Sequence, residues 1–321
     1  MLLVVLGHTI SGTVREYSDS MLFQVVWTLQ MPLFILISGY VTRYSKPIYD
    51  GKSLWKFVKK RTLAYLLPWV VWTILVRGLV FGEANFLNMK YMLWHMDSGY
   101  WFLATIWTIS MIYGLSDYLS NKCKKGKKAI VALHILICFL GWLCLSAIGY
   151  MLGIEFFAIK LTLYYTPIYL IGYLYGQVQD SFLSRVHAKS IVNVVVMVSL
   201  CLWLAAINRF DFFYGAEGIG MIAGRFITSM LGCIAVIGLF SASGGGYRLL
   251  NWAGVHSLEV YLTHYLFLSL TPAMNLPILA SKEGMVTLLL NYMLTLTLTL
   301  ATMKLVQCNP VMNRFLYAKR D

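Results

Sequence analysis

The chain contains 321 residues, of which 59% are hydrophobic and 12% are charged, and its formal net charge is +13. Soluble domains carry about 25% charged residues, so this composition excludes an ordinary cytosolic enzyme, a secreted disulfide scaffold and a disordered chain. It predicts an all-α membrane protein that crosses the bilayer several times and forms one integral-membrane domain over residues 1–321.

Membrane helices are predicted from the length of the apolar runs. A helix needs roughly 20 apolar residues to cross a hydrocarbon core of about 30 Å. The first run starts at Met1 without a polar lead-in and is too short to span, so we expect the start of this helix to be missing from the chain. It lacks the basic region and cleavage site of a signal peptide. Ten membrane segments are predicted, at residues 1–14, 20–42, 62–82, 100–119, 129–150, 159–178, 190–207, 218–242, 254–271 and 284–306.

Basic residues alternate from one connector to the next. Eighteen Lys and Arg fall after the second, fourth, sixth and eighth segments and in the C-terminal tail, whereas five fall in the intervening connectors. By the positive-inside rule, this asymmetry predicts that both termini are cytoplasmic. Aromatic residues suit an interfacial belt at the predicted outer boundaries: Tyr91, Trp94, Tyr100, Trp101 and Tyr214. We therefore expect a multi-pass protein of the plasma or inner membrane, with the lipid bilayer as a partner.

Neither nucleic acid nor a metal ion is expected as a partner, and no disulfide framework is expected. A nucleic-acid-binding protein gathers its basic residues on one polar face, whereas here they lie in short connectors between apolar runs. The six cysteines have no paired spacing, so neither a disulfide framework nor a metal site is predicted. These cysteines are Cys123, Cys138, Cys144, Cys201, Cys233 and Cys308.

A few polar residues lie inside the predicted segments. A charged side chain at mid-bilayer costs about 2.5–3.5 kcal/mol on insertion scales, so such residues face a bundle interior or a wet cavity and commonly mark function. The set comprises His8, Gln30, Arg77, Arg225, Glu259 and His264. His8 can act as a general base near neutral pH, or it can be a bundle histidine that is hydrogen-bonded to a neighbouring helix. Arg77, near the outer end of its segment, is expected to snorkel to the interface.

The segment 254–271 carries a polar stripe. Ser257, Tyr261 and His264 stand at i, i+4 and i+7, so they share one helix face, and Glu259 lies on an adjacent face. The stripe is either a packing seam with interhelical hydrogen bonds or a functional site. Arg225 either forms a structural ion pair with Glu259 or binds an anionic part of a substrate.

Basic residues run directly into the third segment at Lys56, Lys59, Lys60 and Arg61. Such runs usually set topology or contact anionic lipids. They would equally suit a cytoplasmic ligand that carries several phosphates. The triple glycine 244–246 lacks the strand and the ending of a phosphate-binding loop, so a flexible loop is the better interpretation.

Five motifs follow one another along the chain: LVVLGH at 3–8, QMPLFILISGY at 30–40, Lys60-Arg61 followed by Leu67-Pro68-Trp69, YWFL at 100–103 and SLEVYLTH at 257–264. In this order they resemble the acyltransferase-3 family of membrane O-acetyltransferases, with the fucose 4-O-acetylase-like branch as the nearest likeness. The resemblance covers nearly the whole chain.

This resemblance implies a ten-helix fold, acetyl-CoA as a cytoplasmic donor substrate rather than a bound cofactor, and a glycan or glycolipid hydroxyl as acceptor. It implies that His8 is catalytic, and Glu259 and His264 are assigned with it as catalytic residues. Three departures from the family pattern occur. The chain begins too late to contain a basic residue about ten positions before His8, Gln30 replaces a frequent histidine, and Ala64 and Tyr65 stand where a second basic residue is usual.

The remaining site residues are assigned by their chemistry. Lys60 and Arg61 are expected to hold the phosphates of coenzyme A. Arg225, or the hydroxyls of Ser38 and Tyr261, would stabilise the oxyanion, with Gln30 also near the substrate. Trp101 would stack on a sugar ring.

The predicted function is O-acetyl transfer from acetyl-CoA to an envelope or exported glycan. One alternative is a glycolipid transporter or flippase that uses His8 and Glu259 as a proton relay. Another is a catalytically inactive relative that serves in a glycan-assembly complex.

Overall fold

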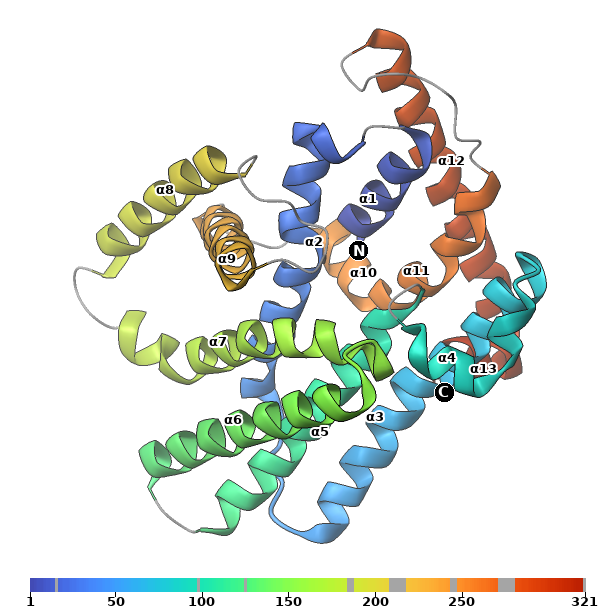
Figure 1. The fold of residues 1–321 in the computed structure, drawn as a ribbon. Coiled ribbons are helices and arrows are strands. Elements are labelled where there is room, and N and C mark those ends of the chain that lie inside the picture. Colours follow the sequence, from blue (N-terminus) through green and yellow to red (C-terminus); the bar gives the residue numbers. More distant parts are fainter. Residues whose placement is uncertain are drawn as a thin grey trace. The chain divides into compact units, whose positions relative to one another are not determined.

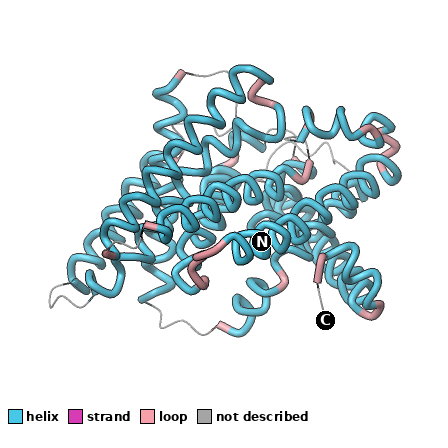
Figure 2. The backbone as a smooth tube through the Cα atoms, turned by 90° about the horizontal axis from the view of Figure 1, so that it is seen from below, coloured by secondary structure: helices cyan, strands magenta, loops and turns pink. Residues whose placement is uncertain are grey.

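The computed structural model describes residues 1–14, 17–96, 99–123, 126–183, 188–207, 218–242, 247–270 and 281–319. Throughout these ranges the backbone forms helices joined by loops, without β-strands (Figure 2). The predicted all-α class is therefore confirmed. The triple glycine 244–246 and the predicted outer-boundary residue Tyr214 lie outside the described residues. The same holds for six of the connector Lys and Arg residues on which the predicted orientation depends: Arg15, Lys124, Lys125, Arg185, Arg209 and Arg320.

Each of the ten predicted segments coincides with helical structure. In chain order these are α1 Leu2–Thr13, α2 Met21–Tyr40, α3 Gly51–Trp72 with a π-helical continuation η3 Thr73–Val80, α5 Trp101–Lys122, α6 Lys127–Leu152, α7 Ile159–Leu183, α8 Ala188–Ala206, α9 Ile219–Ala242, α11 Ser257–Thr263 with a 3-10 continuation η7 His264–Leu270, and α12 Lys282–Gln307.

Length and hydropathy qualify five helical stretches of the described chain as candidate membrane spans. They are Met21–Tyr44, Gly51–Val80, Lys127–Leu152, Ile219–Ser241 and Lys282–Gln307. The membrane character of the chain is thus supported, and the full set of ten crossings with cytoplasmic termini stays a prediction.

The third helix begins at Gly51, well before the predicted segment 62–82. Asp50 caps this helix, because its Oδ1 accepts a hydrogen bond of 2.6 Å from the backbone N–H of Ser53. The Ser53 hydroxyl closes a reciprocal capping box. These hydrogen bonds, led by the Ser53 backbone N–H, hold the pKa of the Asp50 carboxyl below its usual value. Hydropathy missed this first part of the helix because it is helical but basic.

Three short helices were not predicted: α4 Met89–Trp94, α10 Arg248–Val255 and α13 Pro310–Tyr317. Asn88 caps α4 and Asn309 caps α13, each through a side-chain oxygen that accepts from backbone N–H groups of the first turn. Helices of six to eight residues are too short to leave a periodic hydropathy signal.

Prolines lie inside three of the long helices, at Pro32, Pro68 and Pro167. A proline lacks the N–H that would bond the carbonyl four residues earlier, so that carbonyl needs another donor. For Pro167 the carbonyl belongs to Leu163, and it accepts a hydrogen bond of 2.9 Å from the indole Nε1 of Trp142 on α6. A polar contact between helices thus replaces the lost helical bond.

The chain divides into two compact units. Unit 1 comprises Met1–Ile37 and Tyr175–Lys304, and unit 2 comprises Ser38–Leu174 and Leu305–Asp321. Within unit 1, α8 and α9 lie side by side (Figure 1). Gly232 on α9 allows close packing there, since a Cβ at that position would lie 2.9 Å from Leu29 and from Trp203. The Nε1 of Trp203 also donates to the hydroxyl of Thr28 on α2 at 3.2 Å.

Unit 2 contains α3, α5 and α6 as neighbours (Figure 1). The register of α3 against α5 is set by a hydrogen bond of 3.0 Å from Trp107 Nε1 to the hydroxyl of Thr62. Helix α13 packs on α3, where the ring of Tyr317 stacks on Trp72 at 6.0 Å between centroids. The Trp72 indole donates to the Leu316 carbonyl at 2.8 Å, which fixes the tail helix in place.

Candidate functional site

Two of the predicted catalytic residues meet in unit 1, although they come from opposite ends of the sequence. His8 on α1 and His264 at the start of η7 have ring centroids 5.4 Å apart and planes inclined by 37°. Tyr265 presents its ring edge-on to both imidazoles, with centroids 5.9 Å from His8 and 6.3 Å from His264. The two histidines and this tyrosine form the centre of the candidate site.

The burial of the two histidines differs. His264 is 1% exposed, whereas His8 is partly exposed. The Nδ1 of His264 lies 3.0 Å from the carbonyl oxygen of Val260, one helical turn earlier. Its Nε2 is buried and has no hydrogen-bond partner among the described residues. His8 is therefore the more exposed member of the pair.

Gln30 lies against α1 directly before His8. A Cβ added at Gly7 would come within 2.7 Å of Gln30 Oε1 and 3.2 Å of Val26, so the glycine makes room for the α2 side chains. Gln30 is 7% exposed, and its Oε1 has no hydrogen-bond partner in the described part of the chain. A buried polar side chain thus lies against Gly7, the residue before His8, and its role near the substrate stays a prediction.

The polar stripe on α11 is buried. Tyr261 and His264 share one face as the spacing predicted, with ring centroids 6.0 Å apart. Glu259 is fully buried, and its Oε1 lies 3.1 Å from Nδ1 of His256. His256 was not singled out from the sequence, although its i, i+3 spacing to Glu259 at the start of a predicted segment was a usable signal. Arg225 on α9 is 2% exposed, and charged residues are rarely buried to this degree unless they are paired or functional.

The two predicted phosphate-binding residues lie in unit 2. Lys60 is exposed and Arg61 is partly buried on α3. The Arg61 guanidinium lies over the rings of Phe57 and Tyr65, at 5.3 and 5.7 Å from their centroids. Its Nη1 also donates to the Tyr65 hydroxyl at 2.8 Å. Because these aromatic residues flank Arg61 one turn before and one turn after it, they fix the direction of its guanidinium.

The basic part of α3 lies alongside apolar helices. The ring of Phe57 contacts Tyr113 on α5 at 6.4 Å between centroids, and Tyr113 contacts His134 on α6 at 5.0 Å. Phe57 precedes the predicted segment 62–82, whereas Tyr113 and His134 lie inside the predicted segments 100–119 and 129–150. Lys60 and Arg61 follow Phe57 by about one turn, so the predicted spans of α5 and α6 extend alongside them.

Ser38 and Trp101 also belong to unit 2. Ser38 is partly buried near the end of α2, next to Gly39, where a Cβ would overlap the carbonyl oxygen of Tyr169. Trp101 begins α5 and stacks on Tyr165 with centroids 5.5 Å apart and planes inclined by 15°. One face of the indole is thus already covered by a protein side chain.

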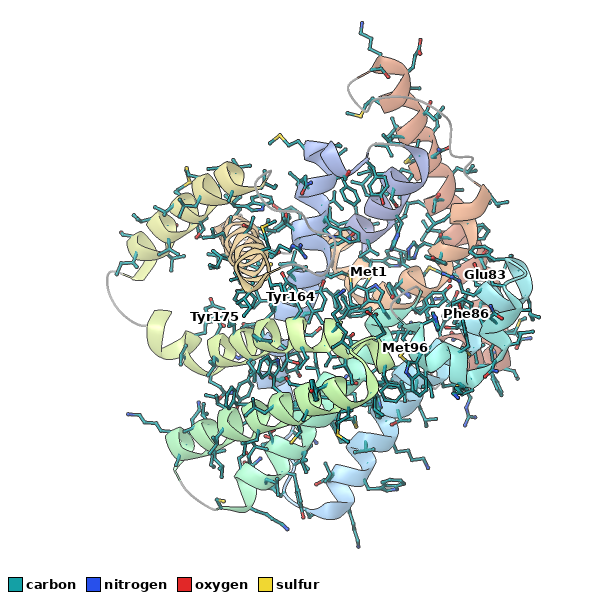
Figure 3. The ribbon with its side chains drawn as sticks, in the orientation of Figure 1. Met1, Glu83, Phe86, Met96, Tyr164 and Tyr175 are labelled. Atoms are coloured by element: carbon teal, nitrogen blue, oxygen red, sulfur yellow. The ribbon has the colours of Figure 1, made fainter. Side chains whose placement is uncertain are left out.

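Arg77, which was expected to snorkel to the interface, forms an ion pair near the end of its helix. It pairs with Glu83 at 2.6 Å, and its guanidinium lies 4.4 Å from the ring centroid of Phe86. Figure 3 labels Glu83 and Phe86 in this region, close to α4. The charge of Arg77 is thus paired with a carboxylate six residues away.

Among the described residues, potential metal ligands do not gather in one place. Within the described ranges, no group of three His, Cys, Asp or Glu side chains is arranged to hold a metal ion. The polar groups that the candidate site offers to a bound molecule are imidazoles, buried charges and hydroxyls.

Comparison with models of protein families gives a match over residues 1–303 to a family described as an acyltransferase domain, of the acyltransferase-3 type. Comparisons with curated proteins and with solved structures give no match.

Proposed function

Because the chain belongs to the acyltransferase-3 family, whose domain it matches over residues 1–303, we propose that it is a membrane O-acetyltransferase. The proposed donor is acetyl-CoA on the cytoplasmic side. The proposed acceptor is a sugar hydroxyl of an envelope or exported glycan, and the proposed location is the plasma or inner membrane. Membership of the fucose 4-O-acetylase-like branch is part of the same proposal.

The observation that carries this proposal is the contact between His8 and His264. Acyl transfer from a thioester to an alcohol needs a group that takes the hydroxyl proton and later returns it to the leaving thiolate. A partly exposed imidazole in an otherwise buried polar cluster suits that task. General acid–base catalysis of this kind contributes typically about 10²–10⁴-fold to the rate.

Two chemical routes use His8. In the first, His8 accepts the proton of the sugar hydroxyl while its oxygen attacks the thioester carbonyl carbon. The C–S bond then breaks, and the imidazolium returns the proton to the coenzyme A sulfur. In the second, the lone pair of His8 attacks the thioester carbonyl carbon, the C–S bond breaks, and the thiolate takes the proton of the imidazole. The sugar hydroxyl oxygen then attacks the acetyl carbon, the bond from that carbon to the His8 nitrogen breaks, and the imidazole takes the hydroxyl proton. Both routes balance without any other reactant.

The donor is assigned to the basic part of α3. Coenzyme A carries several phosphate charges, and Lys60 and Arg61 offer one flexible ammonium and one oriented guanidinium. The contacts of Phe57 and Tyr65 with Arg61 support this role. A guanidinium that is already oriented loses less conformational entropy when it binds a phosphate.

The remaining residues have roles in the proposal that follow from their charge and burial. Arg225, Ser38 and Tyr261 are candidates to stabilise the oxyanion of the tetrahedral intermediate. Trp101 would bind a sugar through the indole face that Tyr165 does not cover. Glu259, bonded to His256, would keep the polar cluster around His264 ordered.

A second candidate function is proton-coupled transport of a glycolipid. The buried Glu259 carboxylate next to the partly exposed His256 supports this alternative, since such pairs carry protons in transporters. Purified protein in liposomes separates the two functions. The enzyme transfers radiolabelled acetyl from acetyl-CoA to a glycan acceptor, whereas the transporter moves glycolipid under a proton gradient without consuming acetyl-CoA. Absence of both activities would favour an inactive relative.

A further inference from the structure

We propose that His264 is a positioning residue that fixes which ring nitrogen of His8 carries the proton. The inference rests on the proposed function, because it assigns a role at the same site. It goes beyond that function by giving the two histidines unequal tasks.

The position of the proton on His264 follows from its hydrogen bond. A carbonyl oxygen only accepts, so the 3.0 Å contact between Nδ1 and the Val260 carbonyl requires the proton on Nδ1. In the neutral imidazole, Nε2 is then an acceptor with a free lone pair. That nitrogen is buried and has no partner within the described ranges. An unused acceptor therefore lies inside the site.

Burial decides what this acceptor can serve. His264 is 1% exposed, so a large sugar or thioester cannot reach Nε2 directly. The partly exposed ring of His8 lies 5.4 Å away between centroids and can donate an N–H to it. Tyr265, edge-on to both rings, restricts the orientations that either imidazole can adopt. His264 thus acts on the reaction through His8.

The chemical consequence concerns the second nitrogen of His8. When the N–H of one His8 nitrogen donates a hydrogen bond to His264 Nε2, the other nitrogen keeps its lone pair for the acceptor hydroxyl or the thioester. Catalytic hydrogen bonds are often long without substrate and tighten when it binds, so a small rotation of the His8 ring completes the contact. The transferred proton stays on His8 and returns to the thiolate, and His264 remains neutral throughout.

The test uses two variants of His264 in the full-length protein in detergent or liposomes. His264→Gln keeps an acceptor near the position of Nε2, whereas His264→Leu removes it. The readout is ¹⁵N NMR of histidine-labelled protein above the titration range of His8, where the shifts of the two ring nitrogens report its tautomer. Acetyl transfer is measured in parallel. His134→Gln is the matched control, because His134 is likewise buried and neither of its ring nitrogens has a partner in the described chain.

We expect one His8 tautomer in the unaltered protein, in His264→Gln and in His134→Gln, and a mixture of both tautomers in His264→Leu. We expect kcat of His264→Leu to fall roughly 10- to 100-fold, as for other partners that orient a functional imidazole, while KM for acetyl-CoA is unchanged. A single His8 tautomer in His264→Leu, or a mixture in the unaltered protein, would overturn the inference. The NMR result does not depend on turnover, so failure of the proposed function alone leaves this test intact. Should His264→Leu misfold, the milder His264→Phe variant replaces it, with the same expected tautomer mixture and the same fall in kcat.

Discussion

Gly7 and Gln30 are packed so closely that a methyl group on Gly7 would come within 2.7 Å of the Gln30 amide oxygen. We predict that Gly7→Ala destabilises the protein by about 1–3 kcal/mol, the usual cost of overpacking a core. The measurement is reversible unfolding in mixed micelles, read by tryptophan fluorescence.

The double variant Gly7→Ala with Gln30→Ala is the control for this prediction. Shortening Gln30 removes the atom that the new methyl group meets, so much of the loss should be recovered. Gly51→Ala serves as the neutral comparison, because its Cβ would meet no atom within 4 Å other than those of the adjoining residues and its own helical backbone. Equal costs at Gly7 and Gly51 would show that the close packing does not exist.

Removal of the His8 imidazole should abolish most of the activity. We predict that His8→Ala lowers kcat by about 10²–10⁴-fold, the contribution of a general base, with little change in stability. Acetyl transfer by purified protein is the measurement. His95→Ala is the matched control, since His95 lies exposed after α4 and stacks on Tyr91. Normal turnover in His8→Ala would end the assignment of this residue.

The hydrogen bond from Arg61 to Tyr65 gives a prediction about donor affinity. Tyr65→Phe keeps the aromatic ring and removes the hydroxyl that accepts from Arg61 at 2.8 Å. A net loss of about 1 kcal/mol corresponds to roughly a fivefold higher KM for acetyl-CoA, with kcat unchanged. Tyr49→Phe, at an exposed position before α3, should leave KM unaltered. A selective fall in kcat would instead place Tyr65 in the chemical step.

The charge asymmetry predicts the orientation of the connectors. In a variant without native cysteines, Tyr49→Cys and Met312→Cys should react with a membrane-impermeant maleimide only after the cells are permeabilised. Ile154→Cys should react in intact cells. All three positions are exposed on the protein, so the membrane alone decides their reactivity. Labelling of Met312→Cys in intact cells would contradict a cytoplasmic C-terminus.

The helices were predictable because hydropathy responds directly to burial in lipid. The apolar run 129–150 became α6 with ends within two residues of the prediction. The first part of α3 was not predictable in that way, because its stability comes from the capping box at Asp50 rather than from apolar residues. The short helices α4 and α13 depend on asparagine caps, which also leave no hydropathy signal.

The candidate site was only partly predictable, since spacing along one helix gives contacts within that helix alone. The shared face of Tyr261 and His264 followed from helical periodicity. The hydrogen bond between Arg61 and Tyr65 could also have been predicted from helical periodicity, because the two residues are four positions apart. The contact of His8 with His264 joins distant parts of the sequence, and no local pattern encodes it.

The bond from the Trp142 indole to the Leu163 carbonyl has a consequence for how α6 can vary. Only three α6 residues are buried. In a bilayer, moving an apolar side chain from lipid to a neighbouring helix yields no hydrophobic free energy. The helix is therefore attached at a few points, one of which is the contact of Trp142 with the proline-opened turn of α7. Between these contacts most apolar residues would pack against lipid equally well. The lipid-facing surface of α6 should therefore vary among homologous sequences, whereas Trp142 should not.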